Sequence, residues 1–333
     1  MPDLQLTLAG TGRRARTALA VVTACGALAF TMAAASPAAA DAPAALTQVA
    51  TIPILGAPTG LADDSATSTV YATDEGAEAV YVINAATNAV TATIPVGQGP
   101  TGLAVDSVTD TIYTANYVAG TVSVIDGATN TVTATISGLS GVGTIAVNTE
   151  TDTVYANRGY SGISVIDGAT NTVTGTITSV VGGTLAANSK NGRIYLGAGN
   201  HLTVINGTTD RVITTITGLP VWVNGLAVDT ATDTVYVGGK HEGVVQINGK
   251  TDTLVTKLGI KAKIHGLAID QADNKLFTAG KPATYPVGEI NLKTSRVMAT
   301  GSVASAHNIA IDPATRMIYV DGYGSGVITA FSF

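Results

Sequence analysis

Two histidines of this chain stand directly before matching segments and therefore occupy one repeated position. His265 precedes residues 266–270 and His307 precedes residues 308–312, which share an apolar pattern that ends in Asp. Asp321 follows the second segment. Two imidazoles and a carboxylate can bind a divalent metal, and an imidazole can act as a general base beside a partner acid. His265 and His307 are therefore candidate catalytic residues, and with Asp321 they are candidate metal ligands. The alternative is that both histidines hydrogen-bond to backbone or water.

Other polar and aromatic side chains lie in comparable segments and are candidates for ligand binding. Asn224 holds the position of the two histidines one repeat earlier, and His241 and Glu242 follow the next apolar segment. Aromatic rings combine a large apolar face with a polar edge, which suits contact with a sugar or a peptide. The aromatic candidates are Tyr117, Tyr160, Trp222 and Tyr323. The alternative for these rings is packing within their own loops.

Several other chemistries have no support in the sequence. It contains no Gly-x-Ser-x-Gly elbow, no phosphate-binding loop and no paired cysteines at metal-ligand spacing. The single cysteine, Cys25, lies near the N-terminus, in a segment that we expect to be removed. Lys240, Lys281 and Arg158 are few and separated, so we expect them to be solvated surface charges. No cofactor is evident beyond the divalent metal that the histidines suggest.

The candidate residues belong to a unit that occurs seven times, and such regular repetition indicates a repeat architecture. Residues 102–106 read Gly-Leu-Ala-Val-Asp, and successive copies begin 42, 42, 40, 41, 41 and 42 residues apart. An aromatic residue keeps the same step and gives a second, independent marker. The copies begin at Gly60, Gly102, Thr144, Thr184, Gly225, Gly266 and Asn308, and the aromatic markers are Tyr71, Tyr113, Tyr155, Tyr195, Tyr236, Phe277 and Tyr319.

Each unit has the pattern of four short strands joined by tight turns. In the second unit the expected strands are residues 102–106, 111–115, 121–125 and 131–136, in which apolar and polar residues alternate. Asx-Gly turns join the third strand to the fourth. Their Asn and Asp residues suit either the backbone angles of a hairpin or calcium ligation, and the absence of spaced acid pairs favours the hairpin.

Four-stranded units of about 40 residues are typical of β-propeller blades. The last unit ends after its third strand, and residues 46–53 resemble the fourth strand of the first unit. Pairing of the two would close the ring and protect the sheet edges. The sequence therefore predicts an all-β protein whose residues 41–333 form one seven-bladed propeller of antiparallel four-stranded blades. In such a ring the candidate residues lie in loops of one face around a central channel.

The repeats resemble those of the YVTN family of propellers. The resemblance rests on Tyr-Val/Thr, Val-Ile-Asp/Asn and Ala-Thr-Asn-Thr-Val-Thr-Ala-Thr-Ile, which are clearest in residues 112–136 and 154–177. It implies an exported or surface-associated protein that binds a ligand or partner. Some relatives bind DNA. Without three Arg and one Asp of residues 1–40, however, 14 basic and 22 acidic side chains remain, a net charge of −8. Such a surface repels phosphate backbones, so we expect no nucleic-acid partner.

A second resemblance concerns position alone. Streptogramin lyases are seven-bladed propellers that open a cyclic depsipeptide with histidines and metal-binding acids. Their two key histidines precede the inner strand in successive blades, as His265 and His307 do, and an acid after the following strand corresponds to Asp321. The lyases have a further acid where this chain has Ser305. The resemblance implies a metal-assisted lyase or hydrolase.

The first 40 residues resemble a secretory signal peptide. Arg13, Arg14 and Arg16 precede an apolar run, and an Ala-x-Ala pattern ends at Ala40. We therefore expect a secreted or cell-envelope protein, and no segment after residue 40 is long and apolar enough to span a membrane. A lipid anchor at Cys25 is an alternative, although the apolar run continues past it.

Composition supports the β fold and leaves three functional hypotheses. Only 12% of the 333 residues are charged and 38 are Gly, which suits short strands and turns. The first hypothesis is a secreted protein, expected to be a monomer, that binds a small ligand, peptide or cell-surface polymer without catalysis. The second is the metal-assisted lyase or hydrolase. The third is a structural protein of the cell envelope.

Overall fold

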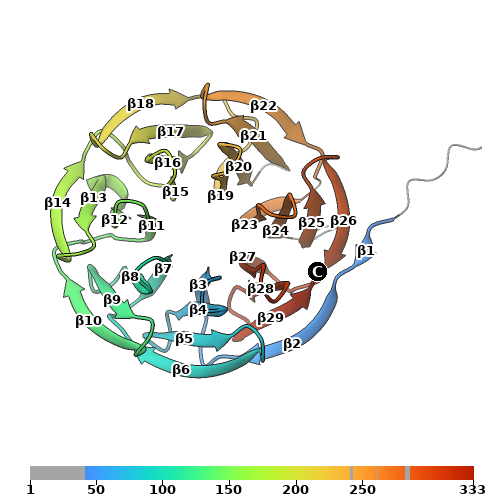
Figure 1. Ribbon diagram of the computed structural model, residues 1–333, viewed down its shortest axis with the longest axis horizontal. Coiled ribbons are helices and arrows are strands. Elements are labelled where there is room, and N and C mark those ends of the chain that lie inside the picture. The colour runs from blue at the N-terminus through green and yellow to red at the C-terminus, as the bar shows by residue number, and fades with distance from the viewer. Residues whose placement is uncertain (1–41, 241–242, 261, 282–285) are drawn as a thin grey trace, which may run out of the picture. The chain divides into compact units, whose positions relative to one another are not determined.

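The computed structural model describes residues 42–240, 243–260, 262–281 and 286–333. Within them, seven antiparallel sheets surround a central channel (Figure 1). The predicted all-β, seven-bladed propeller is confirmed. Pro43–Phe333 form one compact unit, and the expected signal peptide lies outside the described residues. In the part of the chain that is described, no helix is long and apolar enough to span a membrane.

Each blade places its first strand at the channel and its fourth strand at the rim (Figure 1). Blades 1 to 3 contain, from the channel outwards, β3 (Pro58–Asp64), β4 (Thr69–Asp74), β5 (Ala79–Asn84) and β6 (Ala89–Pro95); β7 (Pro100–Asp106), β8 (Thr111–Asn116), β9 (Thr121–Asp126) and β10 (Thr131–Ile136); and β11 (Thr144–Asn148), β12 (Thr153–Asn157), β13 (Ile163–Asp167) and β14 (Thr172–Ile177). A 3₁₀ turn, η1 (Gly159–Ser161), lies between β12 and β13.

The remaining blades follow the same order. Blades 4 to 7 contain β15 (Thr184–Asn188), β16 (Arg193–Ala198), β17 (His201–Asn206) and β18 (Arg211–Ile216); β19 (Val223–Asp229), β20 (Thr234–Gly239), β21 (Val244–Asn248) and β22 (Thr253–Leu258); β23 (Lys263–Asp270), β24 (Lys275–Lys281), β25 (Val287–Asn291) and β26 (Arg296–Gly301); and β27 (Ala306–Asp312), β28 (Met317–Gly322), β29 (Val327–Ser332) and β2 (Thr47–Pro53).

Asx residues organise the tight turns of the blades. Between β7 and β8, Asp106 accepts hydrogen bonds from the backbone N–H groups of Val108 and Thr109, at 2.9 and 3.3 Å. Asp110 closes that turn with a φ of 52°, in the left-handed region that Asn, Asp and Gly tolerate best. Between β9 and β10, Asp126 accepts from the Thr129 N–H at 2.7 Å. These contacts agree with the hairpin interpretation of the Asx residues.

The core lies between the blades. The aromatic marker of each blade is buried and belongs to a cluster with residues of the next blade. Tyr71 of blade 1 clusters with Ile112 and Ile125 of blade 2. Tyr319 of blade 7 clusters with Val70 of blade 1, so the series continues across the two chain ends. Each blade is therefore stabilised by its two neighbours.

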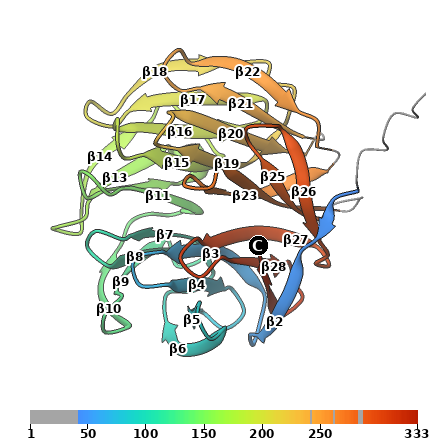
Figure 2. The ribbon, with the colours of Figure 1, turned by 45° about the vertical axis from the view of Figure 1, so that its right-hand side comes forward.

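The ring is closed by a strand from the N-terminal side, as predicted. β2 pairs antiparallel with β29 and completes blade 7. Ile52 of β2 is 3% exposed and packs in the cluster between blades 7 and 1. No sequence pattern predicted a further strand, β1 (Ala44–Ala45), which pairs parallel with β26 of blade 6. β1 and β2 are separated only by Leu46, so this short segment pairs with two neighbouring blades (Figures 1 and 2).

Replacement of Ile52 by Ala tests how strongly β2 holds the ring together. Loss of this buried side chain leaves a cavity in the closing cluster, and Ile→Ala substitutions in cores cost roughly 2–5 kcal/mol of unfolding free energy. The measurement is urea unfolding followed by circular dichroism. Val49→Ala is the matched control, because Val49 lies on the same strand and is 48% exposed. Equal losses in the two variants would contradict a closing role for the buried face of β2.

Candidate functional site

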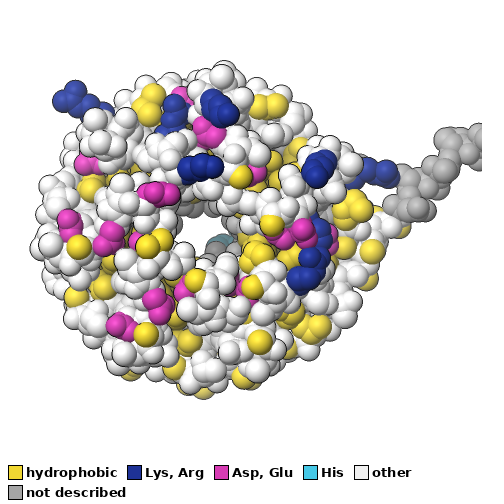
Figure 3. Space-filling model, in the orientation of Figure 1, with side chains coloured by type: hydrophobic (Ala, Val, Ile, Leu, Met, Phe, Trp, Pro, Cys, Tyr) yellow, Lys and Arg dark blue, Asp and Glu magenta, His cyan; other side chains and the backbone are white. Residues whose placement is uncertain are grey.

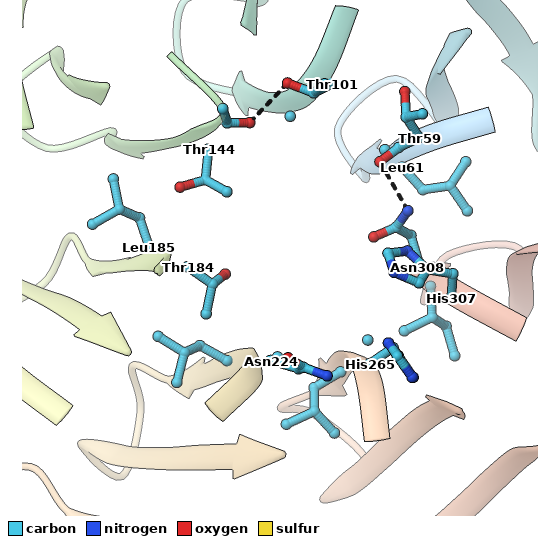
Figure 4. A pocket seen from close by; sticks show the side chains of 18 of the residues that line it. Thr59, Leu61, Thr101, Thr144, Thr184, Leu185, Asn224, His265, His307 and Asn308 are labelled. Carbon is cyan, nitrogen blue, oxygen red and sulfur yellow. Dashed lines mark hydrogen bonds between the residues drawn. The ribbon is translucent and has the colours of Figure 1, made fainter. Parts of the chain in front are cut away.

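The inner strands surround a cavity of about 650 Å³ (Figure 4). This volume falls within the range of small-molecule sites. The cavity is bounded by two sets of equivalent positions from the seven blades. We call the outer set the mouth ring: Thr59, Thr101, Gly143, Gly183, Asn224, His265 and His307. The inner set is apolar: Leu61, Leu103, Ile145, Leu185, Leu226, Leu267 and Ile309.

At the mouth ring of blades 5 to 7, β-bulges interrupt the regular pairing between the first and second strands. The register between inner and second strand shifts between Val223 and Gly225 in blade 5, and between Ile264 and Gly266 in blade 6. A similar shift occurs in blade 7, between Ala306 and Ile309. A β-bulge re-aims a side chain. Asn224, His265 and His307, which lie at these positions, line the cavity (Figure 4).

Two glycines allow the inner strands to come close enough to form the mouth. A Cβ atom added to Gly225 would lie 2.8 Å from the carbonyl oxygen of His265, and one added to Gly266 would lie 2.6 Å from that of His307. Side chains at these positions would push the neighbouring inner strand away. The glycine of the repeat marker therefore fixes the backbone of each histidine against the preceding blade.

On one side of the mouth, polar side chains are used to join neighbouring blades. Thr59 donates a hydrogen bond to the Pro100 carbonyl at 2.8 Å, and Thr101 donates to the Gly143 carbonyl at 3.0 Å. Asn308 of blade 7 donates to the Thr59 carbonyl at 3.0 Å (Figure 4). The polar groups of blades 7, 1 and 2 are thus already paired at these points.

On the other side the mouth ring keeps its polar groups available. Within the described residues, no hydrogen bond joins the side chain of Asn224, His265 or His307 to the next blade. The Nδ1 atom of His307 is buried and has no hydrogen-bond partner there. Buried polar atoms are normally paired, so this unpaired atom is unusual, and its own surface is enclosed by the protein.

The two histidines form the centre of a continuous polar cluster. Their ring centroids lie 4.9 Å apart, and the His307 ring lies 5.5 Å from that of Tyr323. The Lys281 ammonium lies 5.4 Å from the centre of the Tyr323 ring, and Lys240 lines the cavity from blade 5. We call these five residues the His–Lys cluster. It draws on blades 5, 6 and 7.

Burial and the lysines lower the basicity of both histidines. Desolvation lowers the pKa of His265 to about 4, and the charges of His307, Lys281, Lys240 and Lys263 act in the same direction. Desolvation also lowers the pKa of His307, again with a contribution from Lys281. At neutral pH both imidazoles are therefore uncharged, and each has a nitrogen that can accept a hydrogen bond.

Asp321 lies beneath the histidines and is fully buried. Its two carboxylate oxygens accept hydrogen bonds from Asn308, at 2.6 Å from the backbone N–H and 2.7 Å from the side-chain amide. Burial raises the pKa of Asp321 to about 6. Among the described residues, no three or more His, Cys, Asp and Glu side chains are placed to hold a metal ion. The structure therefore brings His265 and His307 together, while Asp321 positions Asn308.

The remaining candidates are spread more widely. Asn224 lines the cavity and Tyr323 touches His307, as described above. Tyr117, Tyr160 and Trp222 are exposed, by 56%, 96% and 50%, and none of them lines the cavity. His241 and Glu242 lie outside the described residues.

Lys240 is exposed, as the sequence analysis expects, and it also lines the cavity. Lys281 is half-buried, and its ammonium group lies over the Tyr323 ring. The two lysines follow or end the second strands of blades 5 and 6. The only sequence signal was their equivalent position after two successive repeats.

Comparisons with known proteins identify the fold. No family model and no curated protein sequence matches the chain. Among solved structures, 1712 chains match. One is a chain in the crystal structure of a mitotic checkpoint complex, with a TM-score of 0.76 and 16% identity over 93% of this chain and 99% of that one. At this identity the likeness establishes the propeller fold alone, and so widespread a fold does not specify a function. The resemblances to YVTN propellers and streptogramin lyases remain predictions.

Substitution of Lys281 by Met tests the electrostatics of the site. Loss of this charge favours the protonated imidazoles, so the pKa of His265 and that of His307 should both rise. When folding lowers the pKa of a histidine, the free energy of unfolding decreases as the pH falls from 6.5 to 4. The free energy of unfolding of the variant should decrease less over this range. Both pKa values can be measured by NMR titration of the imidazole protons.

Lys190→Met serves as the control, because Lys190 lies in the turn between β15 and β16. An unchanged pKa at both histidines in Lys281→Met, or an equal rise in the control, would contradict this arrangement.

Proposed function

We propose that this protein is a binding protein whose ligand occupies the mouth of the propeller channel, on the side formed by blades 5 to 7. The proposal rests on one observation. Polar groups of the mouth are joined to neighbouring blades around blades 7, 1 and 2. Asn224, His265 and His307 line the cavity, and their side chains make no such bond within the described part of the chain.

The form of the cavity supports a small ligand or the end of a larger one. Its volume of about 650 Å³ accommodates a peptide of a few residues or a short saccharide. The inner apolar ring provides an apolar wall, and the mouth ring provides directional hydrogen bonds. A few polar groups above an apolar wall is the usual composition of a specific site.

Binding can be tested by NMR titration with a panel of short peptides, saccharides and cell-wall fragments. We expect at least one member to shift the signals of Asn224, Asn308 and the His307 ring. His307→Ala should weaken that binding at least tenfold, because it leaves polar groups of the ligand unpaired.

Tyr160→Ala is the control for this titration, since Tyr160 is 96% exposed and lies away from the cavity lining. Shifts confined to the opposite end of the channel, or equal affinity in wild type and His307→Ala, would contradict the proposed site.

The alternative function is a metal-assisted lyase or hydrolase with His265, His307 and Asp321 at the channel mouth. The observation that favours it is a pair of neutral imidazoles whose ring centroids lie 4.9 Å apart. A neutral imidazole can act as a metal ligand or as a general base. In this alternative Asp321 acts through Asn308, to which both its oxygens are bound.

Metal analysis distinguishes the two functions. As a binding protein without catalysis, the purified protein should contain no stoichiometric metal, and added Zn²⁺ should leave its melting temperature unchanged. Bound metal, or a rise in melting temperature that is absent from the His265→Ala/His307→Ala variant, would contradict this expectation and favour the lyase.

The proposed setting is outside the cytoplasm. It is supported by the signal-peptide pattern of residues 1–40. A purely structural role in the cell envelope, the third hypothesis, predicts that removal of both histidines changes no binding property.

A further inference from the structure

We propose that the ligand carries an oxyanion, a carboxylate or phosphate group, which binds at the His–Lys cluster. This inference rests on the proposed binding function and specifies the chemistry of its ligand. Three features carry it: the cations that converge on blades 5 to 7, the absence of acids from the described cavity wall, and the polar groups that face the cavity beside the cations.

The cations converge from separate elements. Lys240 lines the cavity from the end of β20, and Lys281 comes from the end of β24. The Lys281 ammonium lies over the Tyr323 ring, and the Tyr323 ring lies beside the His307 ring of the mouth. Within the described residues, neither lysine is within 4.0 Å of a carboxylate oxygen. Two ammonium groups held beside one half of a cavity favour a negatively charged occupant.

The described wall of the cavity contains no Asp or Glu. This is notable for a chain of net charge −6. The Asp321 carboxylate of blade 7 is fully buried, and both its oxygens accept hydrogen bonds from Asn308. It therefore orients the Asn308 amide and does not occupy the position that an anion would take.

The two ends of the channel differ in charge. The blades run clockwise in Figure 1 and anticlockwise in Figure 4, so these figures view opposite ends. The end drawn in Figure 3, in the orientation of Figure 1, has Asp and Glu side chains and also Lys and Arg side chains around the opening. The cavity of Figure 4 opens at the other end, where Lys240 and the two histidines lie. The lysines beside the cavity therefore favour an anion at the cavity end.

Hydrogen-bond donors lie beside the cations. The amide of Asn224 comes from the mouth ring, and Figure 4 shows it directed towards the cavity. The neutral imidazoles of His265 and His307 each supply one N–H group. Charge-assisted hydrogen bonds to an oxyanion are shorter and stronger than neutral ones. The mixture of lysine charge with amide and imidazole donors therefore suits a group with two or three exposed oxygens.

The test is NMR titration of the purified protein with four probes: inorganic phosphate, citrate, trigalacturonate and neutral maltotriose. We expect the three anions, and not maltotriose, to shift the signals of Asn224, His265 and His307. Their dissociation constants should increase with NaCl concentration, because salt screens the charges. Lys240→Met and Lys281→Met should each weaken anion binding by about three- to tenfold, and Lys190→Met should not. The amide spectrum of each variant reports whether its fold is retained.

The four probes distinguish an acidic saccharide from a free small anion as the source of the oxyanion. Tighter binding of trigalacturonate than of citrate and phosphate assigns the oxyanion to an acidic saccharide, and the reverse order assigns it to a free small anion; both support the inference. Maltotriose that binds at the mouth as tightly as trigalacturonate, without dependence on Lys240 or Lys281, overturns the oxyanion inference and leaves the binding function intact. No shift at the mouth with any of the four probes overturns the oxyanion inference, and the peptide and cell-wall panel then decides the proposed function separately.

Discussion

Apolar packing between neighbouring blades is the constraint on which the rest of this structure depends. The buried aromatic of each blade packs in a cluster shared with the next blade, and the cluster of Tyr319 extends across the chain ends to blade 1. Seven such contacts satisfy every blade only when the ring is closed. The pairing of β2 with β29 provides this closure, and β1 extends the same segment onto blade 6. A closed ring also limits the exposure of sheet edges.

The closed ring determines where a ligand can bind. Glycine at the first position of the repeat marker lets the inner strands approach closely in blades 5 and 6, as at Gly225 and Gly266. The residue before that position is bulged in blades 5 to 7 and turns into the cavity. Where this residue is Thr, as at Thr59 and Thr101, its hydroxyl joins the neighbouring blade. Where it is Asn or His, its polar groups face the cavity. The site is thus a variation within a structural position that every blade has.

Much of the fold and part of the site were predictable from the sequence, because equivalent positions of a repeat occupy equivalent places in the ring. Two markers in one register predicted seven blades, the strands of each blade and the closing strand, and the equivalence of His265 and His307 predicted that they meet. Other features depend on contacts that no period encodes. The approach of Lys281 to His307 through Tyr323 depends on two loop conformations. The engagement of Asp321 by Asn308 depends on a bulge, and β1 has only two residues and no turn signal.

The central claim of this account is that the half of the channel mouth formed by blades 5 to 7 holds a ligand through its oxyanion. Intermolecular nuclear Overhauser effects between the methylene protons of citrate and the protein test it most directly, because they report contact and not only perturbation. The account predicts such effects to the ring protons of His307 and Tyr323, and their loss at high salt. Effects confined to residues at the opposite end of the channel, with none at His307 or Tyr323, would contradict it.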